Sequence, residues 1–160
     1  MSNLTSTLKL QHWFVSNLLE AAQWIGVGKP EAQRQLKAAK ARLLAHFKLE
    51  HTLLYPVLLE AAETNVELKR TLEMLAKDMA GVPTEMMSFF EQCDNRDQQR
   101  QTTLEIGNIL FLLQTRIRRE EDTLYAEFDK LRTAARIMVA RQMTDSRLSM
   151  GASCPSIHHM

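Results

Sequence analysis

The sequence predicts an all-α protein, folded as an antiparallel up-down four-helix bundle. Helix-forming residues abound, while the 160 residues include only 5 glycines and 4 prolines. That composition leaves little material for a sheet with tight turns. Apolar residues recur at three- and four-residue spacing in four long segments separated by short breaks. Helices that each carry one apolar stripe bury those stripes best by packing together as a bundle.

The first two predicted helices are separated by a glycine-containing break. The first covers about residues 4–25 and ends where Gly26 can stop a helix. Pro30 begins the second at a position that needs no amide donor. This helix continues to about residue 63, and Pro56 predicts a kink inside it.

The third and fourth predicted helices complete the bundle. Asn65 can cap the third, which covers residues 66–93. The fourth begins at residue 97 or 98 and extends beyond residue 131. Because the composition then turns to Ser, Gly, Pro and His, we expect one bundle domain over residues 1–143 and a disordered tail over 144–160.

Charge and composition exclude several classes of protein. The formal net charge of +1 lacks the basic footprint of a nucleic-acid binder. No apolar run approaches the roughly 20 residues that span a bilayer, and no secretory signal precedes the first helix. Two cysteines, Cys93 and Cys154, make no disulfide framework. We therefore expect a cytoplasmic protein with neither a nucleic-acid nor a membrane partner.

Polar residues interrupt three of the apolar stripes. His12 lies in the first, His46 and Glu50 in the second, and Arg116 beside Glu120 in the fourth. A buried imidazole or carboxylate is costly unless it is paired or binds a metal, so these groups are predicted to meet. The second stripe is predicted to comprise Leu36, Ala39, Leu43, His46, Glu50, Leu53 and Val57, and the fourth Ile106, Ile109, Leu113, Ile117, Glu120, Leu124 and Leu131.

The chain also contains a weak internal repeat. ARLLAHFKLEHTLLYPVL and FLLQTRIRREEDTLYAEF share the same rhythm, including the ending in Leu-Tyr. In this alignment the pair His46 and Glu50 corresponds to Arg116 and Glu120. The lone His12 corresponds to Met79.

HFKLEHTLLYP resembles the H-F-x-x-E-[EH]-x-x-L-Y-P signature of the hemerythrin-like (HHE cation-binding) family. RIRREEDTLYAEF is similar to the family's second copy of this helix and KLQHW to its lone-histidine helix, so that the resemblance covers about residues 4–132. It implies a bundle built from two repeats. It also implies that His12, His46 and Glu50 are ligands of a first metal half-site and that Glu120 is the bridging carboxylate.

The chain departs from that family at the second half-site. Met79 and Arg116 stand where the family has its third and fourth histidines. Arginine stays protonated and offers no lone pair, and a thioether is a poor ligand for a hard ferric ion. We expect a degenerate di-iron site with at most one ion, iron or zinc. Alternatively there is no metal, and Arg116 pairs with Glu50 or Glu120.

Two functions remain open. The first is a metal-binding, sensing or regulatory domain without enzymatic activity, since no phosphate loop or nucleophile motif is present. The second follows from a resemblance to the regulator of sigma D family of anti-sigma factors, carried by AHF at residues 45–47 and by Arg116-x-x-x-Glu120. That resemblance implies binding of the housekeeping sigma factor through protein contacts. The protein is expected to be a monomer or homodimer.

Overall fold

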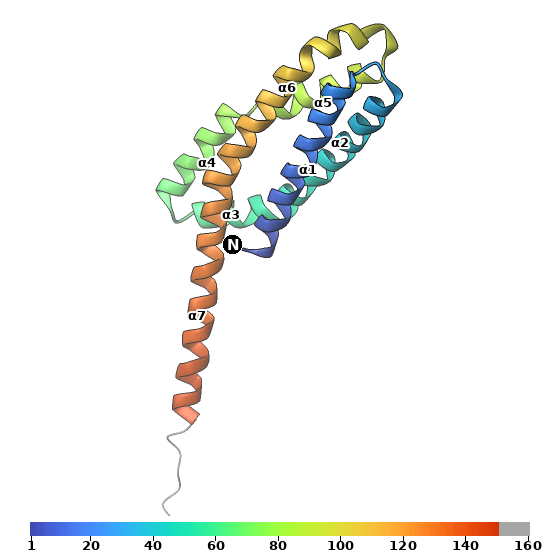
Figure 1. Cartoon of the computed structure of the whole chain (residues 1–160). Coiled ribbons are helices and arrows are strands. Elements are labelled where there is room, and N and C mark those ends of the chain that lie inside the picture. The colour runs from blue at the N-terminus through green and yellow to red at the C-terminus, as the bar shows by residue number, and fades with distance from the viewer. Residues whose placement is uncertain (151–160) are drawn as a thin grey trace, which may run out of the picture.

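The computed structural model describes residues 1–150, which are helical and include no strand (Figure 1). Four helical segments follow one another in this part of the chain. The first is α1 (Asn3–Ile25), and the second comprises α2 (Pro30–Leu49), the π-helical η1 (Glu50–Leu54) and α3 (Tyr55–Ala62). The third comprises α4 (Val66–Asp78) and α5 (Val82–Cys93). The fourth comprises the 3₁₀ turn η2 (Arg96–Gln98), α6 (Gln99–Arg119), the π-helical η3 (Glu120–Tyr125) and α7 (Ala126–Met150).

The predicted helix ends are confirmed where the sequence provides capping residues. Gly26 ends α1 with φ of 99°, a left-handed conformation that favours glycine, and its N–H donates to the Ala22 carbonyl at 3.0 Å. Pro30 is the first residue of α2. The Asn65 side chain accepts a 3.0 Å hydrogen bond from the Leu68 amide and so caps α4.

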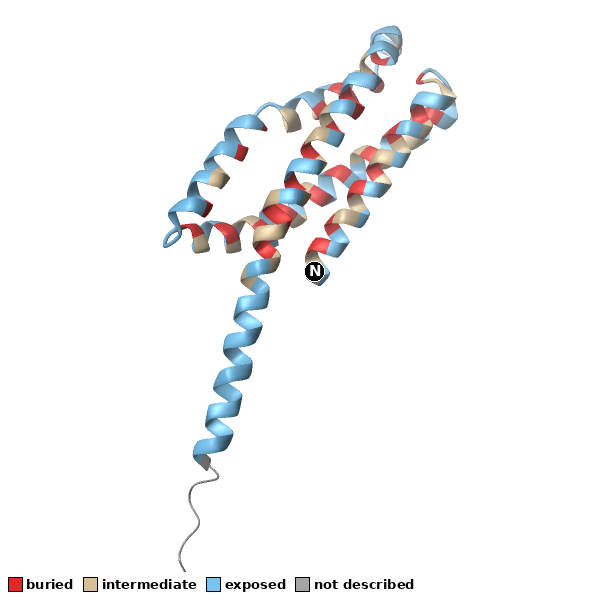
Figure 2. Cartoon of the chain, turned by 60° about the vertical axis from the view of Figure 1, so that its left-hand side comes forward, coloured by how far each residue is buried: buried red, intermediate tan, exposed pale blue. Residues whose placement is uncertain are grey.

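The helices enclose two apolar clusters, one at each end of the molecule. Helix α1 packs against α2 and α6, and α5 packs against the same two helices, so that these four surround the first cluster. The second cluster lies where α3, α4 and the beginning of α7 meet. Figure 2 shows the buried residues on the inward faces of these helices. The first cluster includes Val15, Leu19, Leu36, Leu43, Phe89, Phe90 and Leu113, and the second Leu8, Leu54, Leu58, Met79, Leu124, Tyr125 and Phe128.

The two π-helical segments change which residues face the core. Leu54 and Leu58 are fully buried, whereas Leu53, which the periodicity placed in the core, is 48% exposed. The predicted stripe is therefore wrong at Leu53, because a π-helical turn holds one residue more than an α-helical turn, whereas the predicted Val57 is partly buried and packs against the second cluster. Pro56 lies at the start of α3, where its missing N–H costs least, and the π-helical η1 directly precedes α3 at the place where the sequence predicts a kink.

Helix α7 extends well beyond the bundle (Figure 1). Residues 132–149 are exposed along their whole length, as Figure 2 also shows. Residues 144–150, expected to begin a disordered tail, continue this helix, and 151–160 lie outside the described residues. The serines and arginines of this stretch are compatible with a helix, and glycine and proline occur only beyond it. Among the helices of residues 1–150, none combines the length and apolarity required to cross a membrane.

Candidate metal centre

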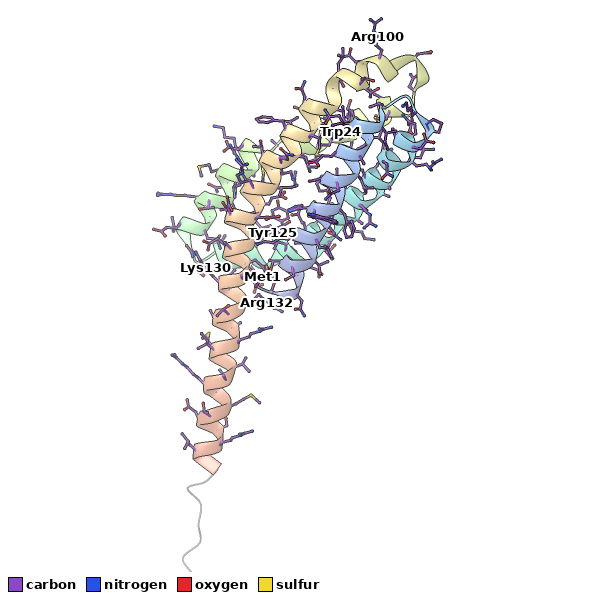
Figure 3. The ribbon with its side chains drawn as sticks, viewed as in Figure 1. Met1, Trp24, Arg100, Tyr125, Lys130 and Arg132 are labelled. Carbon is purple, nitrogen blue, oxygen red and sulfur yellow. The ribbon has the colours of Figure 1, made fainter. Side chains whose placement is uncertain are left out.

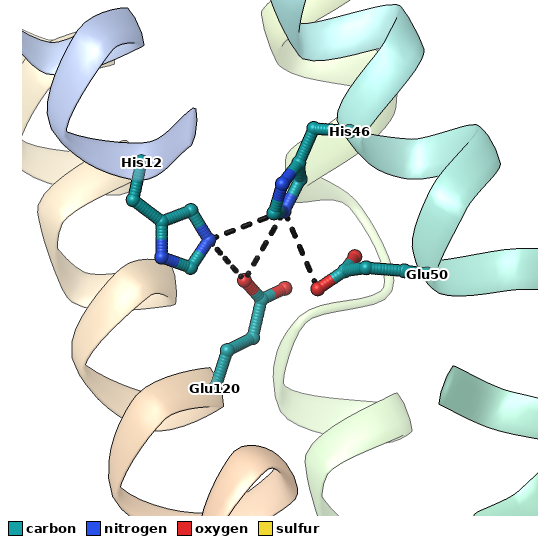
Figure 4. Close-up of side chains that lie close together, drawn as sticks. All are labelled: His12, His46, Glu50 and Glu120. Carbon is teal, nitrogen blue, oxygen red and sulfur yellow. Dashed lines mark hydrogen bonds and ion pairs between the residues drawn. The ribbon is translucent and has the colours of Figure 1, made fainter. Parts of the chain in front are cut away.

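Four buried side chains from three helical segments converge between the two apolar clusters (Figure 4). His12 comes from the middle of α1 and His46 from the last turn of α2. Glu50 and Glu120 are the first residues of η1 and η3. One ligand atom from each lies within 4.8 Å of the other three, so the group could hold a metal ion. The structure thus brings together the four residues that the sequence singled out.

The separations between these atoms are those of neighbouring ligands around one ion. The His12 Nε2 atom lies 3.1 Å from His46 Nε2 and 3.1 Å from Glu120 Oε2. The His46 Nε2 atom lies 3.3 Å from Glu50 Oε1 and 4.0 Å from Glu120 Oε2. Two ligand atoms about 2.1 Å from an ion and at right angles to each other are about 3 Å apart. The side chains therefore need little movement to surround a cation.

A second set of hydrogen bonds orients both imidazole rings. His12 Nδ1 lies 2.8 Å from Glu121 Oε1, and His46 Nδ1 lies 3.0 Å from Gln11 Oε1. Since both partners are acceptor oxygens, each Nδ1 carries the proton and donates. The neutral rings then direct the lone pairs of both Nε2 atoms at each other across 3.1 Å. Two lone pairs at that distance repel unless a cation or a proton lies between them.

The carboxylates strongly favour a positive charge on this cluster. Burial alone would lower the pKa of His46, but hydrogen bonds and charge interactions with Glu120 and Glu50 outweigh it and raise this pKa to about 9. Burial would likewise raise the pKa of Glu120, yet its contacts with His12, His46 and Arg116 lower it to about 2. Without a metal ion, His46 is therefore an imidazolium at neutral pH.

Arg116 lies on the other side of the two carboxylates. Its Nε atom is 2.5 Å from Glu120 Oε1, and its Nη2 atom is 3.5 Å from Glu50 Oε2. Within the described part of the chain, neither Nε nor Oε1 makes a hydrogen bond, so this contact is an ion pair without aligned geometry. The guanidinium also stacks over Phe47, 4.8 Å from the ring centroid. Each carboxylate thus directs one oxygen at the histidines and the other at Arg116.

Sequence reasoning missed three residues of the centre. Met79, which stands where the resemblance expects a histidine, is buried in the second apolar cluster. Gln11 and Glu121, the residues that orient the imidazoles, precede His12 and follow Glu120 in the chain. Tyr125 belongs to the Leu-Tyr ending shared by the repeats, but only the π-helical segment turns it inward. Its hydroxyl donates to Glu50 Oε1 at 2.8 Å.

Comparison with models of protein families, with curated proteins and with solved structures finds no match to this chain.

Proposed function

We propose that the protein is a hemerythrin-like regulatory domain that binds a single iron or zinc ion inside an antiparallel up-down four-helix bundle. The ligands are His12, His46, Glu50 and Glu120. One observation carries the proposal: both imidazoles direct their Nε2 atoms at the same point, 3.1 Å apart, while both Nδ1 atoms are held by acceptor oxygens. The resemblance of HFKLEHTLLYP to the family signature supports it independently.

A metal ion explains this arrangement better than a proton alone. If the centre held only a proton, shared by His46 and a carboxylate, a fixed orientation of the His46 ring alone would be enough. Here Glu121 fixes the ring of His12 and Gln11 fixes the ring of His46. Metal-binding histidines nearly always donate their second N–H to a carboxylate, carbonyl or water, which sets the tautomer and the ring orientation. The donor set of two imidazoles and two carboxylates suits iron or zinc.

The position of Arg116 limits the centre to one ion. The guanidinium contacts the outer oxygens of Glu50 and Glu120, where a second cation bridged by the same carboxylates would lie. The carboxylates of Glu50, Glu120 and Glu121 and the one guanidinium leave two negative charges, which a single divalent ion neutralises. Arg116 therefore supplies permanently the charge of the missing second metal.

Burial favours binding or sensing over turnover of a large substrate. The four proposed ligands are between 0% and 4% exposed. In this conformation the centre is closed to a large substrate. A centre of this kind changes the stability of the bundle when its ion binds, and a regulatory domain can transmit such a change.

The anti-sigma alternative finds less support in the structure. Two residues behind that resemblance, Arg116 and Glu120, are 7% and 0% exposed, and His46 is 2% exposed. They form the interior of the centre and so cannot contact a partner protein.

Metal content measured on protein purified without a chelator or an affinity tag tests the proposal. We expect about one iron or zinc per chain. Ligand at 100 times its Kd stabilises a fold by about 2.7 kcal/mol, which raises the Tm of a domain of this size by about 5–10 °C. His46→Ala should remove both the ion and this stabilisation, whereas the exposed His51→Ala should keep both.

Three outcomes would contradict parts of this proposal. A stable, metal-free protein whose Tm does not respond to iron or zinc rules out the metal function. Two ions per chain would mean that Arg116 does not replace the second cation. Binding that survives His46→Ala but not His51→Ala would place the ion elsewhere.

A further inference from the structure

Tyr125 has its hydroxyl group inside the centre. The residue, labelled in Figure 3, is fully buried. Its ring stacks on His12 with centroids 5.5 Å apart and planes 9° from parallel. The hydroxyl oxygen lies 2.8 Å from Glu50 Oε1 and 3.2 Å from His12 Nε2. The distance to His12 falls within the 3.1–3.3 Å range found between neighbouring proposed ligands, and the distance to Glu50 is shorter. The Tyr125 hydroxyl therefore lies between a ligand atom of His12 and a ligand atom of Glu50.

The hydrogen bonds of this hydroxyl do not satisfy both of its neighbours. Because Glu121 holds the proton of His12 on Nδ1, the Nε2 atom of His12 is an acceptor. Glu50 Oε1 is an acceptor as well, and a phenol has one proton to donate. If that proton goes to Glu50, an oxygen lone pair of Tyr125 faces the lone pair of His12 at 3.2 Å. The Nε2 atom of His12 thus has both the His46 Nε2 atom at 3.1 Å and the Tyr125 oxygen at 3.2 Å.

We propose that Tyr125 is a fifth ligand of the bound ion and that it makes the centre selective for ferric iron. This inference rests on the proposed metal-binding function. A phenolate is a hard, anionic oxygen donor, which suits Fe³⁺ better than Zn²⁺ or Fe²⁺. On binding of Fe³⁺ the O–H bond of Tyr125 breaks, an iron–oxygen bond forms, and the proton leaves to solvent.

The charges around the centre fit this assignment. The centre contains one guanidinium, that of Arg116, and the three carboxylates of Glu50, Glu120 and Glu121. These groups sum to two negative charges. Fe³⁺ with a Tyr125 phenolate adds two positive charges, and a divalent ion with a neutral phenol adds two as well. A buried site is costly to charge, so a phenolate is compatible with the trivalent ion and leaves an uncompensated charge with a divalent one.

The visible spectrum of the iron-loaded full-length protein tests the inference. Metal-free protein is loaded with one equivalent of Fe²⁺ without air and then oxidised with one equivalent of ferricyanide. We expect a phenolate-to-iron charge-transfer band and tyrosinate vibrations in the resonance Raman spectrum. Tyr125→Phe should bind about one iron yet lose the band. The chain has only two tyrosines, so Tyr55→Phe is the matched control and should keep it.

The outcomes separate this inference from the function on which it rests. If wild-type protein binds one iron but shows no such band, or if the band survives in Tyr125→Phe, Tyr125 is not a ligand and the metal function stands. If wild-type protein binds no iron, the proposed function itself fails. Should Tyr125→Phe not fold, ring-deuterated tyrosine in wild-type protein together with Tyr55→Phe gives the same answer. The Raman bands must then shift on labelling and persist in the control.

Discussion

Arg116 is a buried cation that holds two buried carboxylates in place. Its side chain is 8% exposed, and the carboxylates that it contacts are both 1% exposed. A pair of this kind contributes modestly compared with a well-packed apolar core. Removal of one member is nevertheless expensive, because the remaining charge stays buried without a partner. The main effect of Arg116 on stability is therefore that it prevents the two carboxylates from being buried without this counter-charge.

Replacement of Arg116 by alanine should be strongly destabilising. We expect Arg116→Ala to lower the free energy of unfolding of the metal-free protein by about 3–5 kcal/mol, because Glu50 and Glu120 then share His46 as their remaining counter-charge. Arg119 provides the control, since it pairs with Asp78 at 2.6 Å on the surface, and Arg119→Ala should cost less than about 1 kcal/mol. Urea unfolding of the three proteins measures both effects. Equal costs for the two variants would contradict the role given to Arg116.

At the scale of the helical elements, α1 and α7 are joined by one carboxylate. Asp129 Oδ1, on α7, accepts hydrogen bonds from the Ser2 amide at 2.8 Å and from the Thr5 hydroxyl at 2.9 Å. Burial would raise the pKa of Asp129, but these hydrogen bonds and the nearby chain terminus outweigh it and lower the pKa below its usual range. The ionised form is therefore favoured by folding.

This tie should weaken in acid. A carboxyl whose pKa is lower in the folded state stabilises the fold fully above the unfolded pKa of about 3.9, and this contribution disappears as the pH falls through the folded-state value. At pH 7 we expect Asp129→Asn to cost about 1 kcal/mol. The difference from wild type should shrink below about pH 4. Unfolding followed from pH 7 to pH 3 measures it, with Asp145→Asn on the exposed part of α7 as control. A difference that stays constant with pH would show that Asp129 acts through packing alone.

The register of the helices shows where the sequence sufficed and where it did not. Apolar spacing correctly predicted the elements and the inward position of Glu50, because both depend on α-helical periodicity. Apolar spacing failed at Leu53, because no local sequence pattern predicts the extra residue of a π-helical turn. The four residues of the His/Glu cluster were predicted because buried polar groups at one depth must meet. Gln11 and Tyr125 were not, because their roles depend on how the helices rotate against one another.

At the scale of the whole molecule, the distal part of α7 is not packed against the bundle in the described part of the chain. Every residue from 132 to 149 is exposed, and this part of α7 presents Ile137, Met138, Val139, Met143 and Leu148 to solvent. The composition predicted that the packed domain ends before the C-terminus, but it placed this end at residue 143. The reason is that the side chains before residue 144 still favour helix. The packed domain in the structure ends near Leu131, which is the last residue of the second cluster.

Shortening the chain should leave the bundle and its centre intact. We expect a protein that ends at Thr133 to unfold within about 0.5 kcal/mol of the full-length chain, as surface changes usually do. For a domain of this size that corresponds to a change in Tm of about 2 °C or less. Calorimetry and metal analysis of both proteins measure this. A marked loss of stability or of metal would mean that the distal helix packs against the bundle or a second molecule in solution.

The two π-helical segments also bear on the ancestry of the chain. In each half, the extra residue enters at the same point, immediately at a buried glutamate, Glu50 in one half and Glu120 in the other. One inserted residue turns the rest of a helix by about 100°. Both halves make that turn at the matching glutamate, so they share a backbone feature as well as the rhythm of their sequences, as two copies of one ancestral helix pair would.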